Sequence, residues 1–208
     1  MSHRSVSEWQ QWLDAGGGGD RELLLTAAGR WPILISAPHN ATTWRLGKTQ
    51  PRERYTGAIA LALQERYGCQ AMVLLRAPGY DPGFDTGDPY KRRLTDLIRT
   101  ERIRVVLDLH GMSDRGHDLE IGTCHHSTAP RSLTGVARRS LAPFTVRDNE
   151  TVTACREGTV TRTASRHGII GIHLAITHHL RSDAAQHEPV VNAIGRLLRR
   201  IQDDWLSR

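Results

Sequence analysis

Residues 103–111 read Ile103-Arg-Val-Val-Leu-Asp-Leu-His-Gly111, and we expect the chain to fold around them. The run is apolar and β-branched, which is typical of a short buried strand, and it ends in polar residues. Side chains alternate between the faces of a strand, so Asp108 and His110 point to one side and Leu109 to the other. Ligands bind at this carboxyl end of the strands in open α/β sheets. The alternative interpretation is a buried core strand that simply ends in polar residues.

Apolar runs typical of strands alternate with segments of helical spacing along the rest of the chain. The pattern predicts strands over residues 23–27, 31–36, 71–75, 103–110, 118–123, 144–146, 159–163 and 169–177. It predicts helices over residues 5–15, 54–67, 90–100, 130–141 and 184–205. This alternation favours an α/β sheet with helices on both faces.

The chain length of 208 residues fits a single domain spanning 1–208. Residues 1–19 are expected to contain a short N-terminal helix and a flexible link formed by the glycine run Gly16-Gly-Gly-Gly19. The polar segments 40–52, 76–89 and 112–117 are expected to be loops that line a site.

The composition, with 38% hydrophobic and 24% charged residues, is typical of a soluble globular protein. We expect no membrane association and a cytoplasmic location, because no apolar run approaches the ~20 residues that span a bilayer and the N-terminus has no apolar signal core. The net charge of +6 is compatible with nucleic-acid binding. However, the basic residues are scattered and stacking aromatics are few, so we expect no nucleic-acid partner. A basic site for a small anionic substrate explains the charge as well.

The three cysteines, Cys69, Cys124 and Cys155, are odd in number and widely spaced, which does not suggest a disulfide framework. Cys124 begins the sequence Cys-His-His, which is compatible with a metal cluster. The chain has no Cys-x-x-Cys partner for such a cluster, so we interpret this segment as a loop with a free thiol.

A second histidine stands in a context that matches His110. The apolar run Trp31-Pro-Ile-Leu-Ile-Ser36 leads into Ala-Pro-His39, so His39 also closes a strand. If the two strands are neighbours, the imidazoles converge, and Glu53 at the start of the next helix adds a carboxylate. Two histidines, one glutamate and water form a standard catalytic zinc set. Asp108 would then orient an imidazole. Chance placement of two histidines at strand ends is the alternative.

Five segments, in this order, resemble the N-formylglutamate amidohydrolase family, whose relatives are the zinc carboxypeptidases and aspartoacylases. They are Ile35-Ser-Ala-Pro-His39, Glu53, Asp88-Pro-Tyr-Lys-Arg-Arg93, Val106-Leu-Asp-Leu-His-Gly-Met112 with the strand after it, and Gly158-Thr-Val-Thr-Arg162 through Gly171-Ile-His-Leu-Ala-Ile-Thr177. The two histidine motifs and their order are the most specific part of this resemblance.

The resemblance implies a three-layer α/β sandwich with a central mixed, mainly parallel sheet and helices on both faces, as in zinc carboxypeptidases. It implies zinc-dependent hydrolysis of the amide of an N-acyl amino acid, such as an N-formyl derivative, or of a similar small carboxylated substrate. Carried over by position, the zinc (Zn2+) ligands would be His39, Glu53 and His110. A carboxypeptidase-like hydrolase acting on a peptide or carrier-linked substrate is the alternative within the enzymes.

The resemblance also suggests residues for the substrate carboxylate. Arg92 or Arg93, together with Arg162, would bind it, because the planar guanidinium fork pairs with both oxygens of a carboxylate. Thr161 is a weaker candidate for the same role. A solvated surface charge is the alternative for each arginine.

The chain departs from the family at position 175. The family has a glutamate in its last strand where this chain has Ala175, and that glutamate would take a proton from water and pass it to the leaving amine. Three explanations are open. A glutamate was replaced to trap a substrate, which we favour because the other motifs are intact; the base moved to His173, His178 or His179; or the protein binds a ligand without turnover.

Overall fold

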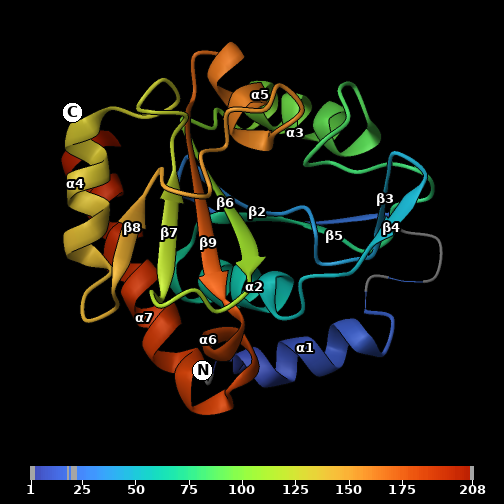
Figure 1. The fold of residues 1–208 in the computed structure, drawn as a ribbon, viewed down its shortest axis with the longest axis horizontal. Coiled ribbons are helices and arrows are strands. Elements are labelled where there is room, and N and C mark those ends of the chain that lie inside the picture. The colour runs from blue at the N-terminus through green and yellow to red at the C-terminus, as the bar shows by residue number, and fades with distance from the viewer. Residues whose placement is uncertain (1–2, 18, 20–22, 207–208) are drawn as a thin grey trace.

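The structure is a computed structural model that describes residues 3–17, 19 and 23–206. Within these residues, seven strands form one central sheet in the order β1-β5-β2-β6-β9-β7-β8 (Figure 1). The strands are β1 (Leu24–Ala27), β2 (Ile33–Ala37), β5 (Gln70–Leu74), β6 (Val105–Met112), β7 (Leu119–Gly122), β8 (Val146–Asp148) and β9 (Ile170–Thr177). The mixed sheet predicted from the resemblance is confirmed.

Strands β5, β2, β6 and β9 run parallel at the centre of the sheet, and the antiparallel pairs β1/β5 and β7/β9 lie toward its edges. The register places Asp108 of β6 beside Ser36 of β2 on one side and beside His173 of β9 on the other. His110 lies beside Ala175, which in turn lies beside Glu120 of β7. These residues therefore share one face of the sheet, as strand alternation requires.

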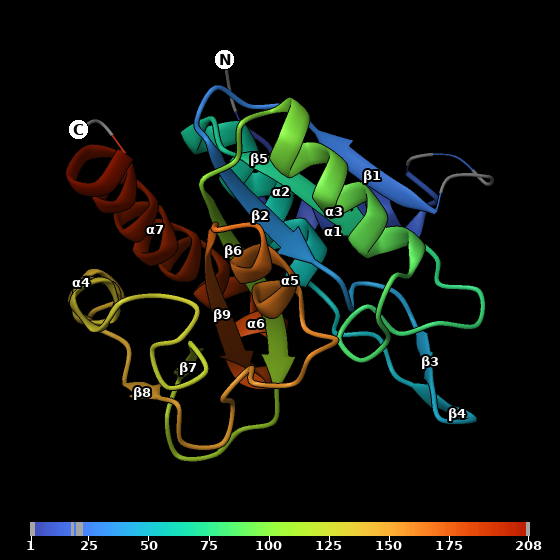
Figure 2. The ribbon, with the colours of Figure 1, turned by 90° about the horizontal axis from the view of Figure 1, so that it is seen from above.

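Helices cover both faces of the sheet, as Figure 2 shows from above. One face packs against α1 (Val6–Asp14), α2 (Thr56–Tyr67), α4 (Arg131–Ser140) and α7 (Ala184–Ile201), which share a large buried apolar cluster with it. The other face is covered in part by α3 (Pro89–Thr100) and α5 (Val160–Arg166), through a smaller cluster that includes Leu34 and Val106. Asp108 and His110 continue the row of Val106 along the same strand face, beyond the apolar contacts of these helices.

Local signals explain where several helices begin. Ser5 and Glu8 form a capping box at the start of α1, in which each side chain bonds the backbone of the other residue. Asp88 caps α3 by accepting a hydrogen bond from the Lys91 amide, and Pro89 occupies the first helical position, where its missing N–H is not needed. The Asp88 cap thus joins the start of α3 to the loop that precedes it.

Two of the predicted segments were wrong. Residues 159–163 were predicted as a strand but begin α5, because the Thr159 side chain caps the helix by accepting a hydrogen bond from the Arg162 amide. Residues 40–52 were predicted as a loop but contain an antiparallel hairpin of β3 (Thr43–Arg45) and β4 (Lys48–Gln50). Gly47, at a positive φ, permits the tight turn between these two strands.

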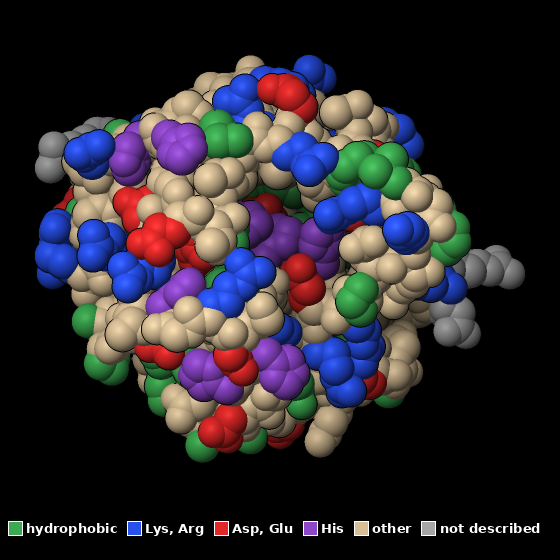
Figure 3. Space-filling model, in the orientation of Figure 1, with side chains coloured by type: hydrophobic (Ala, Val, Ile, Leu, Met, Phe, Trp, Pro, Cys, Tyr) green, Lys and Arg blue, Asp and Glu red, His purple; other side chains and the backbone are tan. Residues whose placement is uncertain are grey.

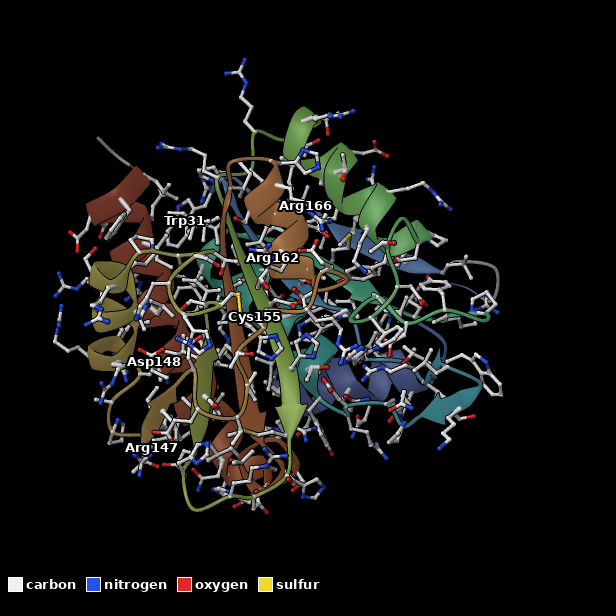
Figure 4. The ribbon with its side chains drawn as sticks, turned by 45° about the horizontal axis from the view of Figure 1, so that its top comes forward. Trp31, Arg147, Asp148, Cys155, Arg162 and Arg166 are labelled. Atoms are coloured by element: carbon white, nitrogen blue, oxygen red, sulfur yellow. A yellow bond between two sulfur atoms is a disulfide. The ribbon has the colours of Figure 1, made fainter. Side chains whose placement is uncertain are left out.

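The expectation of a free thiol at Cys124 was also wrong, because the structure joins Cys124 to Cys155 in a disulfide. The Cys124 amide donates a hydrogen bond to the Thr153 carbonyl, so the end of β7 and the segment before Cys155 lie side by side. Figure 4 shows the sulfur–sulfur bond at Cys155 below α5. A separation of 31 residues gives no local signal of this pairing. Cys69 is a free, buried cysteine.

The remaining elements are the short helix α6 (His178–Ser182) and a terminal π-helical turn over Gln202–Leu206. Of the expected glycine link, Gly18 lies outside the described residues. No helix in the described parts of the chain is long and apolar enough to cross a membrane.

Candidate metal centre and active site

The three predicted ligands converge at one point of the structure. His39 follows β2, His110 lies near the end of β6, and Glu53 precedes α2. The Glu53 carboxylate lies 3.2 Å from Nδ1 of His39 and 3.3 Å from Nδ1 of His110. The Glu53 amide also donates a hydrogen bond of 2.7 Å to the His39 carbonyl, which ties the two segments together.

This geometry fits a tetrahedral metal ion. The potential ligand atoms of His39, Glu53 and His110 all lie within 4.8 Å of one another. Ligands at about 2.1 Å from a tetrahedral zinc ion are roughly 3.4 Å apart, close to the nitrogen–oxygen separations found here. Two imidazoles and one carboxylate would leave a fourth position open, as in catalytic zinc sites.

The far nitrogen of His39 is held by Asp81, a residue that the sequence analysis missed. Nε2 of His39 lies 2.7 Å from Oδ1 of Asp81, and Oδ2 of Asp81 accepts a hydrogen bond of 2.7 Å from Nε of Arg45. The Gly83 amide also donates to Asp81. A Cβ at Gly83 would lie 2.8 Å from the His39 ring, so the 81–85 loop packs directly against this imidazole.

The far nitrogen of His110 is held in the same way by Asp108. Nε2 of His110 lies 3.0 Å from Oδ2 of Asp108, whose other oxygen accepts a hydrogen bond from Ser36. The Ser36 hydroxyl in turn bonds the hydroxyl of the fully buried Tyr90. Each of the two histidines is therefore oriented by a carboxylate, the arrangement that fixes the ring and raises its basicity at metal sites.

The titration of these groups reflects their mutual contacts. Burial lowers the pKa of His110, but the carboxylates of Asp108 and Glu53 outweigh it and raise the pKa to about 10. Burial raises the pKa of Glu53, but the imidazoles of His110 and His39 outweigh it and bring the pKa well below its usual value. The imidazoles thus act as counter-ions for the carboxylates, a role that a bound divalent cation would take over.

A hollow of about 600 Å³ opens beside the three residues. Figure 3 shows histidine side chains at its floor, with an acidic side chain beside them and basic side chains around its rim. The lining residues include the ligands His39 and Glu53, the arginines Arg45, Arg52 and Arg181, and His178. The loop residues 112–114 also contribute, which confirms that part of the expected lining.

Position 175 lies next to the centre, but its alanine side chain is not among the residues that line the hollow in the described part of the chain. Ala175 is 1% exposed and is the register neighbour of His110. His173, two residues earlier on the same face, stacks on His110 with ring centroids 4.1 Å apart. Its Nδ1 is buried without a hydrogen-bond partner, and burial together with His110 lowers its pKa.

Glu120, the other register neighbour of Ala175, binds a loop rather than the site. Its carboxylate accepts hydrogen bonds from the backbone amides of Glu150, Thr151 and Val152 and from the Thr151 hydroxyl. This loop continues into Cys155, so the carboxylate and the disulfide hold the same segment beside β7. Glu120 is fully buried and committed to these contacts.

The residues predicted to bind a substrate carboxylate lie elsewhere. Arg92 and Arg93 are exposed on α3, where they bond the Gly87 carbonyl and the Thr26 hydroxyl. Arg162 on α5 pairs with Glu157, and Thr161 is fully buried beneath it. Figure 4 shows Arg162 on α5 with Arg166. None of these four residues is among those that line the hollow in the described part of the chain, and their substrate role stays a prediction.

Comparison of sequences finds no protein-family model and no curated protein that matches the chain. Solved structures do share its fold. N-formylglutamate amidohydrolase from Ralstonia eutropha JMP134 aligns with a TM-score of 0.61 over 88% of this chain and 98% of that chain, at 14% identity. A gene product from Agrobacterium tumefaciens aligns with a TM-score of 0.59 over 90% of this chain and 94% of that chain, also at 14% identity.

A metallo-carboxypeptidase from Burkholderia cenocepacia aligns with a TM-score of 0.55 over 88% of this chain and 61% of that chain, at 9% identity. The chain thus shares the α/β fold of metallo-carboxypeptidases, as the family resemblance implied. Within that class the chain resembles N-formylglutamate amidohydrolase in fold, which confirms the resemblance drawn from the motifs. At these identities the likeness describes the fold, and the function rests on the site.

Proposed function

We propose that the chain is a zinc-dependent amidohydrolase that cleaves the amide of an N-acyl amino acid or a similar small carboxylated substrate. The observation that carries this proposal is the convergence of His39, Glu53 and His110 beside an open hollow that His39 and Glu53 line. Asp81 and Asp108 support it, because each orients one of the two imidazoles. The amidohydrolase and carboxypeptidase named above share the fold.

The residues of the chain divide into clear roles under this proposal. His39, Glu53 and His110 would hold zinc, which when bound polarises a substrate carbonyl and lowers the pKa of water. Asp81 and Asp108 keep the far nitrogens of the imidazoles engaged, so that the near nitrogens face Glu53. The hollow holds the acyl group and the amide within reach of these ligands.

Proton transfer to the leaving amine needs a further group, and position 175 is where we place it. The register puts this position beside His110, on the face that carries the centre. Alanine cannot accept a proton, so we expect the chain as given to turn over slowly. A general base contributes typically 10²–10⁴-fold to a rate.

The test compares Ala175→Glu with Ala175→Gln, which has the same shape but no proton-accepting carboxylate. Both variants and the chain as given are loaded with zinc and assayed on N-formyl and N-acetyl amino acids and on short peptides. We expect one zinc per chain in each protein, and amide hydrolysis that rises about 10²-fold or more only in Ala175→Glu. A preference for peptides over N-acyl amino acids would instead support the carboxypeptidase-like alternative.

A second candidate is a metal- and ligand-binding protein without turnover, favoured by the alanine at 175. It predicts zinc and carboxylate binding but no hydrolysis, even in Ala175→Glu. Fast hydrolysis by the chain as given would show that the base lies elsewhere. His178, which lines the hollow, is then the first residue to replace. Failure to bind zinc would contradict both candidates.

A further inference from the structure

Arg45 is bound to the metal centre through a single carboxylate. The two oxygens of Asp81 accept hydrogen bonds from Nε2 of His39 and from Nε of Arg45, each at 2.7 Å. Asp81 itself is fully buried, whereas the Arg45 side chain is 33% exposed and lines the hollow. The guanidinium is therefore anchored at one nitrogen and open at its other end.

From this geometry we propose that Arg45 is the specificity-determining residue that binds the carboxylate of the substrate. The inference rests on the proposed amidohydrolase function and adds the residue that selects an acid over a neutral analogue. Within the described residues, the structure shows Arg45 in one ion pair, to Asp81 through Nε, and no acceptor for its two terminal nitrogens. Two terminal N–H groups in a plane are the fork that pairs with both oxygens of a carboxylate.

The guanidinium is also held in position by its neighbours, which reduces the entropy lost on binding. It lies 5.4 Å from the centre of the Phe84 ring, within the range of a cation–π contact. The 81–85 loop that carries Phe84 is closed by hydrogen bonds from the Asp81 amide to Asp85 and from the Phe84 amide to the Asp81 carbonyl. The same short loop thus positions His39 and Arg45.

The other arginines of the hollow are committed to different contacts. Arg181 donates from Nε to the Ile176 carbonyl and from Nη1 to the Arg54 carbonyl, and it is 6% exposed. Arg52 pairs through Nη2 with Asp14 of α1 at 2.8 Å. Arg45, by contrast, lines the hollow and is anchored by Asp81, the same carboxylate that contacts His39.

The short link through Asp81 also limits the size of the substrate. One carboxylate bridges Nε2 of the His39 ring and Nε of Arg45, so an acid bound at Arg45 shares one hollow with an amide at His39 and Glu53. We therefore infer a substrate whose carboxylate is close to the scissile amide, as in an N-acyl α-amino acid. An analogue in which a carboxamide replaces the carboxylate loses the charge that the guanidinium pairs with.

The test measures discrimination between acid and amide with Arg45→Gln and with the control Arg138→Gln. Glutamine keeps an N–H donor for Asp81 but removes the charge and the fork, whereas Arg138 is exposed on α4, which packs on the opposite face of the sheet. The zinc-loaded chain is titrated by calorimetry with N-acetyl-L-alanine and with N-acetyl-L-alaninamide. The same pair of ligands is then assayed for hydrolysis in the Ala175→Glu background.

We expect Arg45→Gln to weaken acid binding about 10- to 100-fold and to leave amide binding unchanged, so that the ratio of the two affinities collapses. Arg138→Gln should keep the affinity ratio of the unsubstituted chain. An unchanged ratio in Arg45→Gln, or no preference for the acid in the chain as given, overturns the inference. Binding without hydrolysis contradicts the proposed function but not this role of Arg45.

Arg45→Lys is a second variant, and it tests carboxylate recognition even if glutamine at position 45 disturbs the local packing. It keeps a cation beside Asp81 but has no planar fork, so we expect acid binding between that of the chain as given and that of Arg45→Gln. Zinc content measured on each protein separates loss of carboxylate recognition from loss of the metal. If lysine binds the acid as tightly as arginine does, the fork has no role in recognition.

Discussion

Asp81 and His39 are 42 residues apart in the sequence, yet the fully buried Asp81 carboxylate lies 2.7 Å from Nε2 of His39. This contact fixes which nitrogen of His39 faces Glu53. It also couples the centre to the 81–85 loop, which local sequence patterns indicate only as part of a loop over residues 76–89. The most informative variants therefore begin at Asp81.

Asp81→Asn should lower zinc affinity about 10- to 100-fold, because an amide orients the imidazole without the charge that raises its basicity. Competition with a chromogenic chelator at fixed pH measures the change. Asp96→Asn is the matched control, since Asp96 is exposed on α3, away from the centre. Equal zinc affinity in the two variants would contradict the orienting role of Asp81.

The metal-free protein should lose stability as pH rises from about 6.5 to about 10. His110 has a pKa of 6.5 when free, and the folded protein raises it to about 10 through Asp108 and Glu53, despite burial. Folding thus favours the protonated imidazole. Its contribution to the free energy of unfolding is present in full below pH 6.5 and is lost as the pH rises through the pKa of the folded state.

Thermal unfolding in the presence of a chelator, at several pH values, measures how the stability of the metal-free protein changes with pH. In His110→Gln the alkaline loss should be smaller, because the titrating group is gone. Zinc affinity should change in the opposite direction and increase with pH, since zinc requires the neutral imidazole and its binding releases protons. A melting temperature that stays constant from pH 6.5 to 10 in the metal-free chain would contradict the pKa shift.

Gly111→Ala should disrupt the centre although it adds one methyl group. A Cβ at Gly111 would lie 2.5 Å from Cζ of Arg181, and the Gly111 amide donates a hydrogen bond to Glu53. Because the Arg181 side chain is buried and anchored at Ile176, displacing it should shift the Glu53 contact and weaken zinc binding.

Gly135→Ala is the control for this substitution. Its Cβ would meet nothing closer than 3.5 Å, and the glycine lies inside helix α4, so alanine should raise stability by about 0.5–1 kcal/mol. Zinc affinity and melting temperature are measured for both variants. If Gly111→Ala binds zinc as the parent chain does, the tight approach of Arg181 does not matter for the centre.

The disulfide between Cys124 and Cys155 should stabilise the fold by about 3–4 kcal/mol, from a loop of 31 residues closed in the unfolded chain. Thiol titration of the denatured, unreduced protein should find only Cys69 reactive. Reduction should lower the melting temperature of the parent chain and leave that of a Cys124→Ser, Cys155→Ser double variant unchanged. Three reactive thiols before reduction would show that the bond does not form.

The fold could be predicted largely from local patterns. The apolar runs and helical spacing located the central strands and the main helices to within a few residues, as with β6 and α7. The errors occurred where short polar segments decide structure by capping and turn formation. Thr159 begins a helix in a segment that is as β-branched as a strand, and Gly47 turns an expected loop into a hairpin.

The candidate site was predictable only in part. His39, Glu53 and His110 follow directly from strand ends and a helix start, and the structure brings them together. The substrate arginines were assigned by motif position, and the structure places them outside the lining of the hollow. Arg45 lay in a segment read as a loop, without a local signal of its contact with Asp81.

The sequence by itself determined which side chains stand at the ends of the central strands, because alternation along β6 places Asp108 and His110 on one face. It also determined that position 175 carries no proton acceptor. Only the tertiary structure decided which carboxylate orients His39, which arginine reaches the hollow, and that Cys124 pairs with Cys155. These contacts join segments 31 to 42 residues apart through loops whose paths depend on packing rather than on local preference.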